Sequence, residues 1–127
     1  MKDAIRGGEV VILDRYAFSG VAFSSAKGLD MEWCISPDKG ILAPDALFYL
    51  DLKIEDAQGR GGFGEERYEK VEFQKKVADK FMSLKDPTWK ILDAKVSKEE
   101  LHEKIVSVVE QVLQNTQNEP LKLLWVD

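Results

Sequence analysis

The sequence lacks several features that would place it in a familiar class. Its 127 residues include one cysteine, Cys34, so no disulfide can form within the chain, as is usual in a reducing compartment. Acidic residues outnumber basic ones by 23 to 18, and a formal net charge of −5 argues against a nucleic-acid-binding surface. No apolar run approaches the roughly 20 residues of a membrane-spanning helix, and the first residues carry no secretory signal. We expect a cytoplasmic protein, or one with a nuclear or mitochondrial pool, that binds neither nucleic acid nor membrane.

The composition is that of one globular domain. Hydrophobic residues make up 44% and charged residues 32% of the chain, which is ordinary for a folded protein and unlike a disordered one. There is no internal repeat and no linker. We therefore predict a single domain over residues 1–127.

Three short apolar runs predict buried strands. They span residues 9–13, 46–50 and 89–92, and each is followed by an aspartate: Asp14, Asp51 and Asp93. Asp51 and Asp93 also suit a simpler role, which is to cap the turns that follow.

Helical patterns lie between the runs. Residues 66–84 carry one apolar stripe, and residues from Ser97 onward carry a second, with Ser97 and Glu100 at capping-box spacing. Residues 16–35 are less periodic and predict a bent or broken helix. Strands that alternate with helices predict an α/β fold with parallel strands and ligands beyond their carboxyl ends, where Asp14, Arg15, Asp51 and Asp93 would lie.

Two motifs could carry chemistry. In Asp14-Arg15-Tyr16 the acid can hold hydrated magnesium and the guanidinium can grip phosphate oxygens, although a strand-end ion pair is an equal alternative. The glycine-rich residues 59–64 match a dinucleotide fingerprint only in spacing. They better suit a mobile flap at about residues 59–67, in which Arg60 and Arg67 would bring positive charge to a substrate, or a plain flexible loop.

Longer strings of residues make the assignment specific. They are residues 11–23 (VILDRYAFSGVAF), 33–34 (WC), 37–38 (PD), 40 (G), 44–45 (PD), 60–69 (RGGFGEERYE) and 73–74 (FQ). In this order and at these spacings they resemble eukaryotic thymidylate kinase, from about Gly8 to Trp125. The resemblance implies phosphoryl transfer from ATP to dTMP with Mg²⁺, giving dTDP and ADP in dTTP biosynthesis, and a possible homodimer.

The resemblance also implies roles for individual residues. Asp14 and Arg15 would lie beside magnesium and the transferred phosphates, with Asp14 reaching the metal through water. Positions that would contact thymidylate are Ser19, Gly20, Phe23, Tyr68 and Gln74. Arg60 would belong to a flap over ATP, and Lys95 and Val96 would lie near adenine. Gln74 alone could equally be a solvated helix residue.

The family fold implied is a three-layer parallel sheet of the P-loop nucleoside monophosphate kinase type. This sequence lacks the family's first strand and phosphate loop, and Met1 to Arg6 match only the end of a preceding helix. The missing strand would lie between residues 9–13 and 46–50, so we expect a gap there, a non-native pairing, or filling by another chain. We also expect an incomplete gene model, splice form or fragment that is inactive alone.

Two other functions stay open. One is a non-catalytic fragment or pseudoenzyme that binds nucleotide or pairs with a full-length kinase. The other is a deoxynucleoside kinase of related fold, which the Tyr-containing flap disfavours. The remaining candidates suit structural roles: His102 has no partner for a metal site, Cys34 suits an idle thiol, and Trp89 and Trp125 suit packing.

Overall fold

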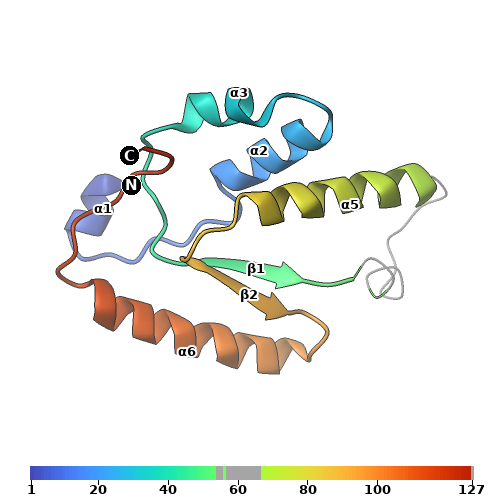
Figure 1. The fold of residues 1–127 in the computed structure, drawn as a ribbon. Helices are drawn as coiled ribbons and strands as arrows, with labels where there is room; N and C mark the ends of the chain where they lie inside the picture. Colours follow the sequence, from blue (N-terminus) through green and yellow to red (C-terminus); the bar gives the residue numbers. More distant parts are fainter. Residues whose placement is uncertain (54–55, 57–66, 127) are drawn as a thin grey trace.

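The computed structural model describes residues 1–53, 56 and 67–126 of the chain. Its elements, in chain order, are α1 (Lys2–Arg6), α2 (Ala17–Ala26), α3 (Met31–Ile35), a 3-10 helix (Ser36–Asp38), β1 (Leu47–Asp51), α5 (Arg67–Ser83), β2 (Trp89–Asp93) and α6 (Lys98–Thr116) (Figure 1). None of the helices in the described ranges has both the length and the hydropathy needed to cross a bilayer.

The described part of the chain has a parallel two-stranded sheet between two layers of helix. β1 and β2 run side by side from the pair Leu47 and Trp89 to the pair Asp51 and Asp93. Helices α2, α3 and α5 lie on one side of this sheet, and α6 lies on the other (Figure 1). This confirms the predicted α/β class, the parallel pairing, and two of the three strands with their bounds shifted by a residue.

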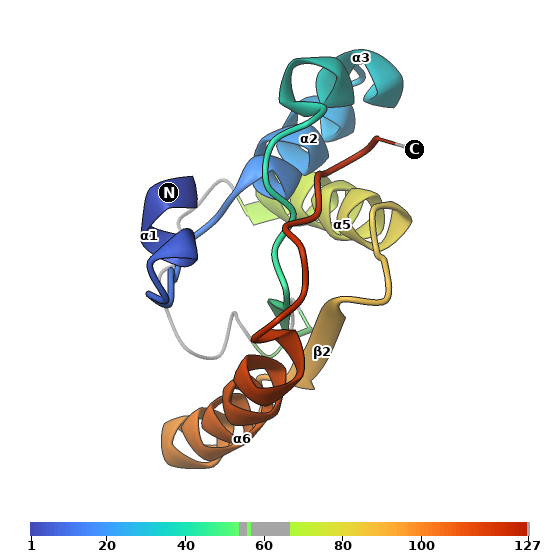
Figure 2. The ribbon, with the colours of Figure 1, turned by 90° about the vertical axis from the view of Figure 1, so that its left-hand side faces the viewer.

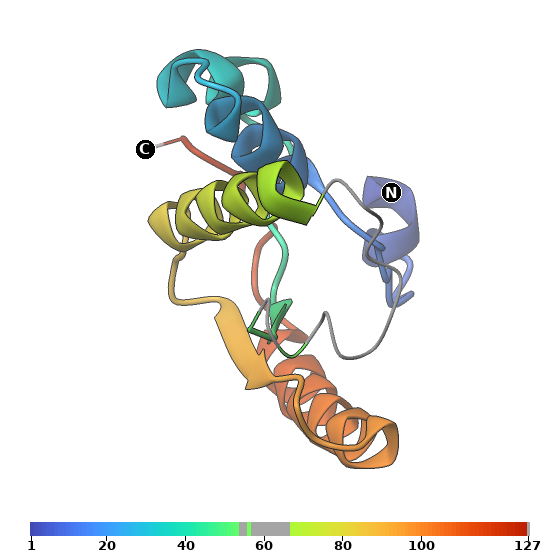
Figure 3. The same cartoon turned by 90° about the vertical axis from the view of Figure 1, so that its right-hand side faces the viewer.

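The predicted strand at residues 9–13 is wrong. The segment has no regular secondary structure, within the described residues it pairs with no strand, and Ile12 is 88% exposed. The apolar run alone suggested a doubly buried strand, yet a strand exists only where a neighbour's backbone groups accept and donate its hydrogen bonds. Figures 2 and 3 show the N-terminal segment on the β1 side of the sheet, away from β2. Of the three outcomes expected at this edge, a non-native pairing of residues 9–13 with β1 does not occur among the described residues, and filling by another chain stays a prediction.

The helices follow the predicted boundaries closely. The broken helix at 16–35 is confirmed as α2 and α3, because Gly28 takes a positive φ of 102° after α2 and Asp30 caps α3 by accepting a hydrogen bond from the Trp33 backbone N–H at 3.0 Å. At the start of α6 the Ser97 hydroxyl accepts from the Glu100 backbone N–H at 3.1 Å. This is one of the two hydrogen bonds of the predicted capping box. The apolar stripe of α6 is only half-buried.

The core lies between α2, α5 and the sheet. Phe18 is 2% exposed, and its ring meets those of Trp89 and Trp125 edge-on, with centroids 5.3 Å apart in both pairs. Leu124 is also buried, because the C-terminal segment pairs antiparallel with residues 40–43 through the hydrogen bonds Gly40 N to Leu124 O, Ala43 N to Lys122 O and Leu124 N to Ile41 O. Both tryptophans therefore pack as predicted, and α2 is held firmly in place.

Candidate functional site

The Asp14-Arg15-Tyr16 motif forms the bend that leads into α2. Arg15 has a φ of 69°, a left-handed conformation that costs a non-glycine residue about 1–2 kcal/mol. Tyr16 fixes the other side of the bend, because its hydroxyl donates to the carbonyl oxygen of Leu42 at 2.8 Å. Burial and, secondarily, the nearby Asp38 carboxylate raise the pKa of the Tyr16 phenol above 10.0, so it stays a neutral donor at physiological pH. The bend is thus a fixed and locally strained feature of the backbone.

The bend places Arg15 against an aromatic surface. The Arg15 guanidinium carbon lies 5.2 Å from the centre of the Phe23 ring, within the range of a cation–π contact. Phe23 in turn packs against two rings of α5, with centroids 6.1 Å from Phe73 and 6.5 Å from Phe81. We call these three phenylalanines the aromatic platform.

Three more predicted residues belong to the same region. Ser19 lies one helical turn before Phe23, so the two share a face of α2. Gly20 follows it on the surface, and a β-carbon there would meet no atom within 4 Å, so the described packing does not require a glycine. Gln74 is exposed and follows the platform residue Phe73 in α5. The structure therefore gathers Arg15, Ser19 and Phe23 along α2, with Gln74 on the helix that packs against it.

Asp14 is an exposed carboxylate beside Arg15. No group of three or more His, Cys, Asp or Glu side chains in the described ranges could hold a metal ion. Mg²⁺ keeps several waters and often needs only one or two protein carboxylates. The residues present therefore fit a hydrated Mg²⁺ contacted by Asp14 through water, and they do not fit a metal site built from protein ligands alone.

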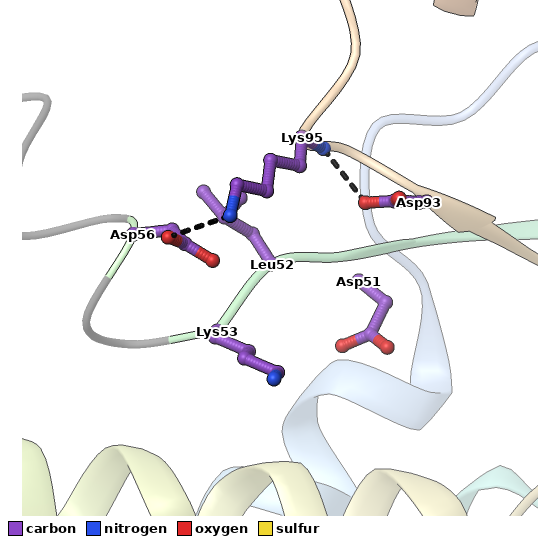
Figure 4. A pocket seen from close by; sticks show the side chains of 6 residues that line it. All are labelled: Asp51, Leu52, Lys53, Asp56, Asp93 and Lys95. Carbon is purple, nitrogen blue, oxygen red and sulfur yellow. Dashed lines mark hydrogen bonds and ion pairs between the residues drawn. The ribbon is translucent and has the colours of Figure 1, made fainter.

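A second group of polar residues lines a hollow of about 730 Å³ at the carboxyl ends of β1 and β2 (Figure 4). Its lining residues are Asp51, Leu52, Lys53, Asp56, Asp93 and Lys95. The Asp93 carboxylate accepts a hydrogen bond from the Lys95 backbone N–H at 2.9 Å, so Asp93 caps its turn as the simpler prediction had it. The Lys95 ammonium lies 3.4 Å from the Asp56 carboxylate and links the two loops that follow the strands.

Sequence reasoning found only part of this hollow. It named Lys95, and it named Val96, which is half-buried in the same turn. It missed Lys53 and Asp56, which come just after β1, where polar residues at a strand's carboxyl end could have drawn attention. The pKa of Tyr49 is raised mainly by burial and secondarily by the nearby Asp51 carboxylate, which shows that Asp51 has a local electrostatic effect.

Some predicted residues lie outside these groups. Arg60 and most of the proposed flap at 59–67 fall outside the described residues, and Tyr68 is described only as part of the backbone of α5. No hydrogen bond or ion pair within the described ranges joins the residues around Arg15 to the hollow lined by Lys95. The two groups therefore stand as separate candidate subsites.

Comparison with known proteins gives one consistent result. A family model described as thymidylate kinase matches residues 1–105. A thymidylate kinase of Arabidopsis thaliana is 55% identical over 98% of this chain and 48% of its own length, and a human thymidylate kinase is 42% identical over 98% of this chain and 61% of its own. A solved thymidylate kinase from Candida albicans has a TM-score of 0.72 and 31% identity, over 88% of this chain and 60% of that one. The chain spans about half to three fifths of the length of these relatives.

Proposed function

This chain belongs to the thymidylate kinase family, and we propose that the protein transfers the γ-phosphoryl group of ATP to dTMP, giving dTDP and ADP for dTTP biosynthesis. The observation that carries the proposal is the family match over residues 1–105, the stretch that holds the predicted site residues. Cytoplasmic location remains a prediction of the composition, and a homodimer remains a prediction of the resemblance.

The acceptor side of the site would lie along α2. Arg15 would bind the phosphate of dTMP, because a guanidinium presents a planar fork of donors to phosphate oxygens. Ser19, Gly20 and Phe23 would line the pocket for the nucleotide. Gln74, an exposed amide on the neighbouring helix, can both donate to and accept from a base, and Tyr68 would contact the same nucleotide.

The donor side would lie at the carboxyl ends of the strands. Lys95 lines the hollow there, and it and the next residue, Val96, would contact adenine. Arg60 would contribute positive charge from the flap at 59–67. Bound Mg²⁺ would neutralise charge on the phosphates, and Asp14 would hold its hydration shell. Positioning and charge stabilisation supply most of the catalysis in phosphoryl transfer.

We further propose that the single domain formed by these 127 residues does not turn over substrate by itself. No glycine-rich loop followed by Lys and Ser or Thr occurs among them, and such a loop supplies the backbone N–H groups and ammonium that cradle a triphosphate. The phosphates of ATP would therefore lack most of their binding partners in this chain.

A chimera tests both proposals. The 127 residues replace the matching stretch of the Arabidopsis thaliana relative, and ADP release is measured with dTMP and, separately, with thymidine. We expect turnover of about 1 s⁻¹ or more with dTMP and much less with thymidine. Preference for thymidine would favour a deoxynucleoside kinase and contradict the proposal. Turnover of about 1 s⁻¹ by the 127-residue chain, assayed beside the chimera, would contradict its proposed inactivity.

A second candidate is a non-catalytic module that pairs with a full-length kinase. It is favoured by the exposed apolar residues 10–13, which lie toward the β1 edge that has no described partner. Co-purification of the chain with the tagged relative would support it. Ile12→Asp should then abolish capture, whereas Val106→Asp, at an exposed apolar position of α6, should not. No capture, or equal loss from both substitutions, would reject this candidate.

A further inference from the structure

The side chain of Arg15 contacts the face of the Phe23 ring. The guanidinium carbon lies 5.2 Å from the ring centre, and no carboxylate of the described residues comes within 4.0 Å of this arginine. A ring face attracts the charge but accepts no conventional hydrogen bond. The five N–H donors of Arg15 therefore stay uncommitted by these residues.

Both ends of this contact are anchored. On the arginine side, the left-handed backbone of Arg15 is followed at once by Tyr16, whose hydroxyl is bonded to Leu42. Strained conformations of this kind persist only where the surrounding structure over-determines them. On the ring side, Phe23 rests against Phe73 and Phe81 of α5, so its face cannot turn freely.

We propose that Phe23 is a positioning residue for Arg15: its ring face, backed by the other two rings of the aromatic platform, holds the guanidinium ready to bind an anionic phosphate of the acceptor nucleotide. An arginine on a flexible stem would lose conformational freedom on binding phosphate, and one already held would lose less. The ring thus acts on phosphate affinity through Arg15. The phosphate part of this inference rests on the proposed function, but the holding of Arg15 does not.

The holding of Arg15 is tested first, by NMR on the 127-residue chain. The Arg15 Nε–H proton should resonate upfield of an ordinary arginine because it lies near the ring. Phe23→Leu keeps an apolar side chain but removes the ring face, so it should return the signal to the ordinary range, whereas Phe23→Tyr should keep it upfield. Phe81→Leu is the matched control, because it removes a ring that Arg15 does not contact and keeps an apolar side chain behind Phe23, so it should leave the signal in place.

The effect on phosphate binding is tested in the chimera. We expect Phe23→Leu to raise the KM for dTMP by about 2- to 5-fold, as for the loss of one exposed cation–π contact, with the KM for ATP unchanged. Arg15→Gln removes the cation and with it the cation–π contact. In the Arg15→Gln background, Phe23→Leu should add little, because the two substitutions remove the same contact.

Three results would overturn the inference. They are an Arg15 signal that Phe23→Leu does not move, an equal rise in the KM for dTMP from Phe23→Leu and Phe81→Leu, and effects of Phe23→Leu and Arg15→Gln that simply add. An inactive chimera would instead overturn the proposed function, and the NMR comparison would still decide whether Phe23 holds Arg15.

Discussion

The exposed segment at residues 9–13 leads to a quantitative prediction about stability. Full burial of an isoleucine side chain is worth about 1.5–3 kcal/mol. Ile12 is 88% exposed, so only roughly an eighth of that gain is realised, and Ile12→Ala should cost about 0.2–0.4 kcal/mol. Val21 is 2% exposed in the core, and Val21→Ala deletes two methyl groups there and leaves a cavity, so it should cost about 2–3 kcal/mol.

The two variants can be compared by urea unfolding of the 127-residue chain followed by tryptophan fluorescence. Trp89 and Trp125 pack against Phe18 and should report loss of the core. For a slope of about 2 kcal/mol per molar urea, Ile12→Ala should move the midpoint by about 0.2 M or less, and Val21→Ala by about 1–1.5 M. A loss above about 1 kcal/mol for Ile12→Ala would show that the segment is buried against a partner and would refute the reasoning.

Three further predictions concern single contacts. Tyr16→Phe should cost about 1 kcal/mol, because it leaves the Leu42 carbonyl without its donor. The pKa of Tyr16 is raised on folding, so the stabilisation by Tyr16 is present below pH 10.0 and is lost as the pH rises through the folded value. The Tyr16→Phe variant should therefore lose less stability in alkali than the unsubstituted chain does. An equal alkaline loss in the two proteins would contradict this. Asp93→Ala should cost about 0.5–1 kcal/mol in urea unfolding by removing the acceptor for the Lys95 N–H, and Asp93→Asn, which keeps an acceptor oxygen, should cost less; equal losses would count against the turn. Ser97→Ala should cost about 1 kcal/mol and reduce helicity in circular dichroism, with Ser97→Asp largely restoring both, whereas no loss would mean that the cap is not needed.

Much of the fold could be predicted because the relevant signals are local. The cap of α6 depends on residues three apart, and the break between α2 and α3 depends on Gly28. The predictions of the strands that end at Asp51 and Asp93 were correct because these two segments pair with each other in the fold. Residues 9–13 have an equally apolar sequence but no described neighbour, so pairing, which no local pattern encodes, decided the outcome.

The candidate site was predictable in its parts and not in its contacts. Resemblance to the family pointed to Arg15 and Phe23 separately, but their contact depends on the left-handed turn at Arg15, which gives no signal in a sequence. The ion pair between Asp56 and Lys95 joins residues that are far apart in the chain, and only the parallel pairing of β1 with β2 brings their loops together. Contacts of this kind follow from topology and not from composition.

The central claim is that these 127 residues carry the acceptor side of a thymidylate kinase site without a cradle for the donor's phosphates. The most direct test is to titrate the purified chain with dTMP and, separately, with ATP and Mg²⁺, while following backbone amide signals by NMR. We predict saturable shifts at Ser19, Phe23 and Gln74 with dTMP, and no saturation by ATP across the range of about 1 μM to 1 mM that is ordinary for enzyme substrates. Saturable binding of ATP in that range, with no response to dTMP, would contradict the account.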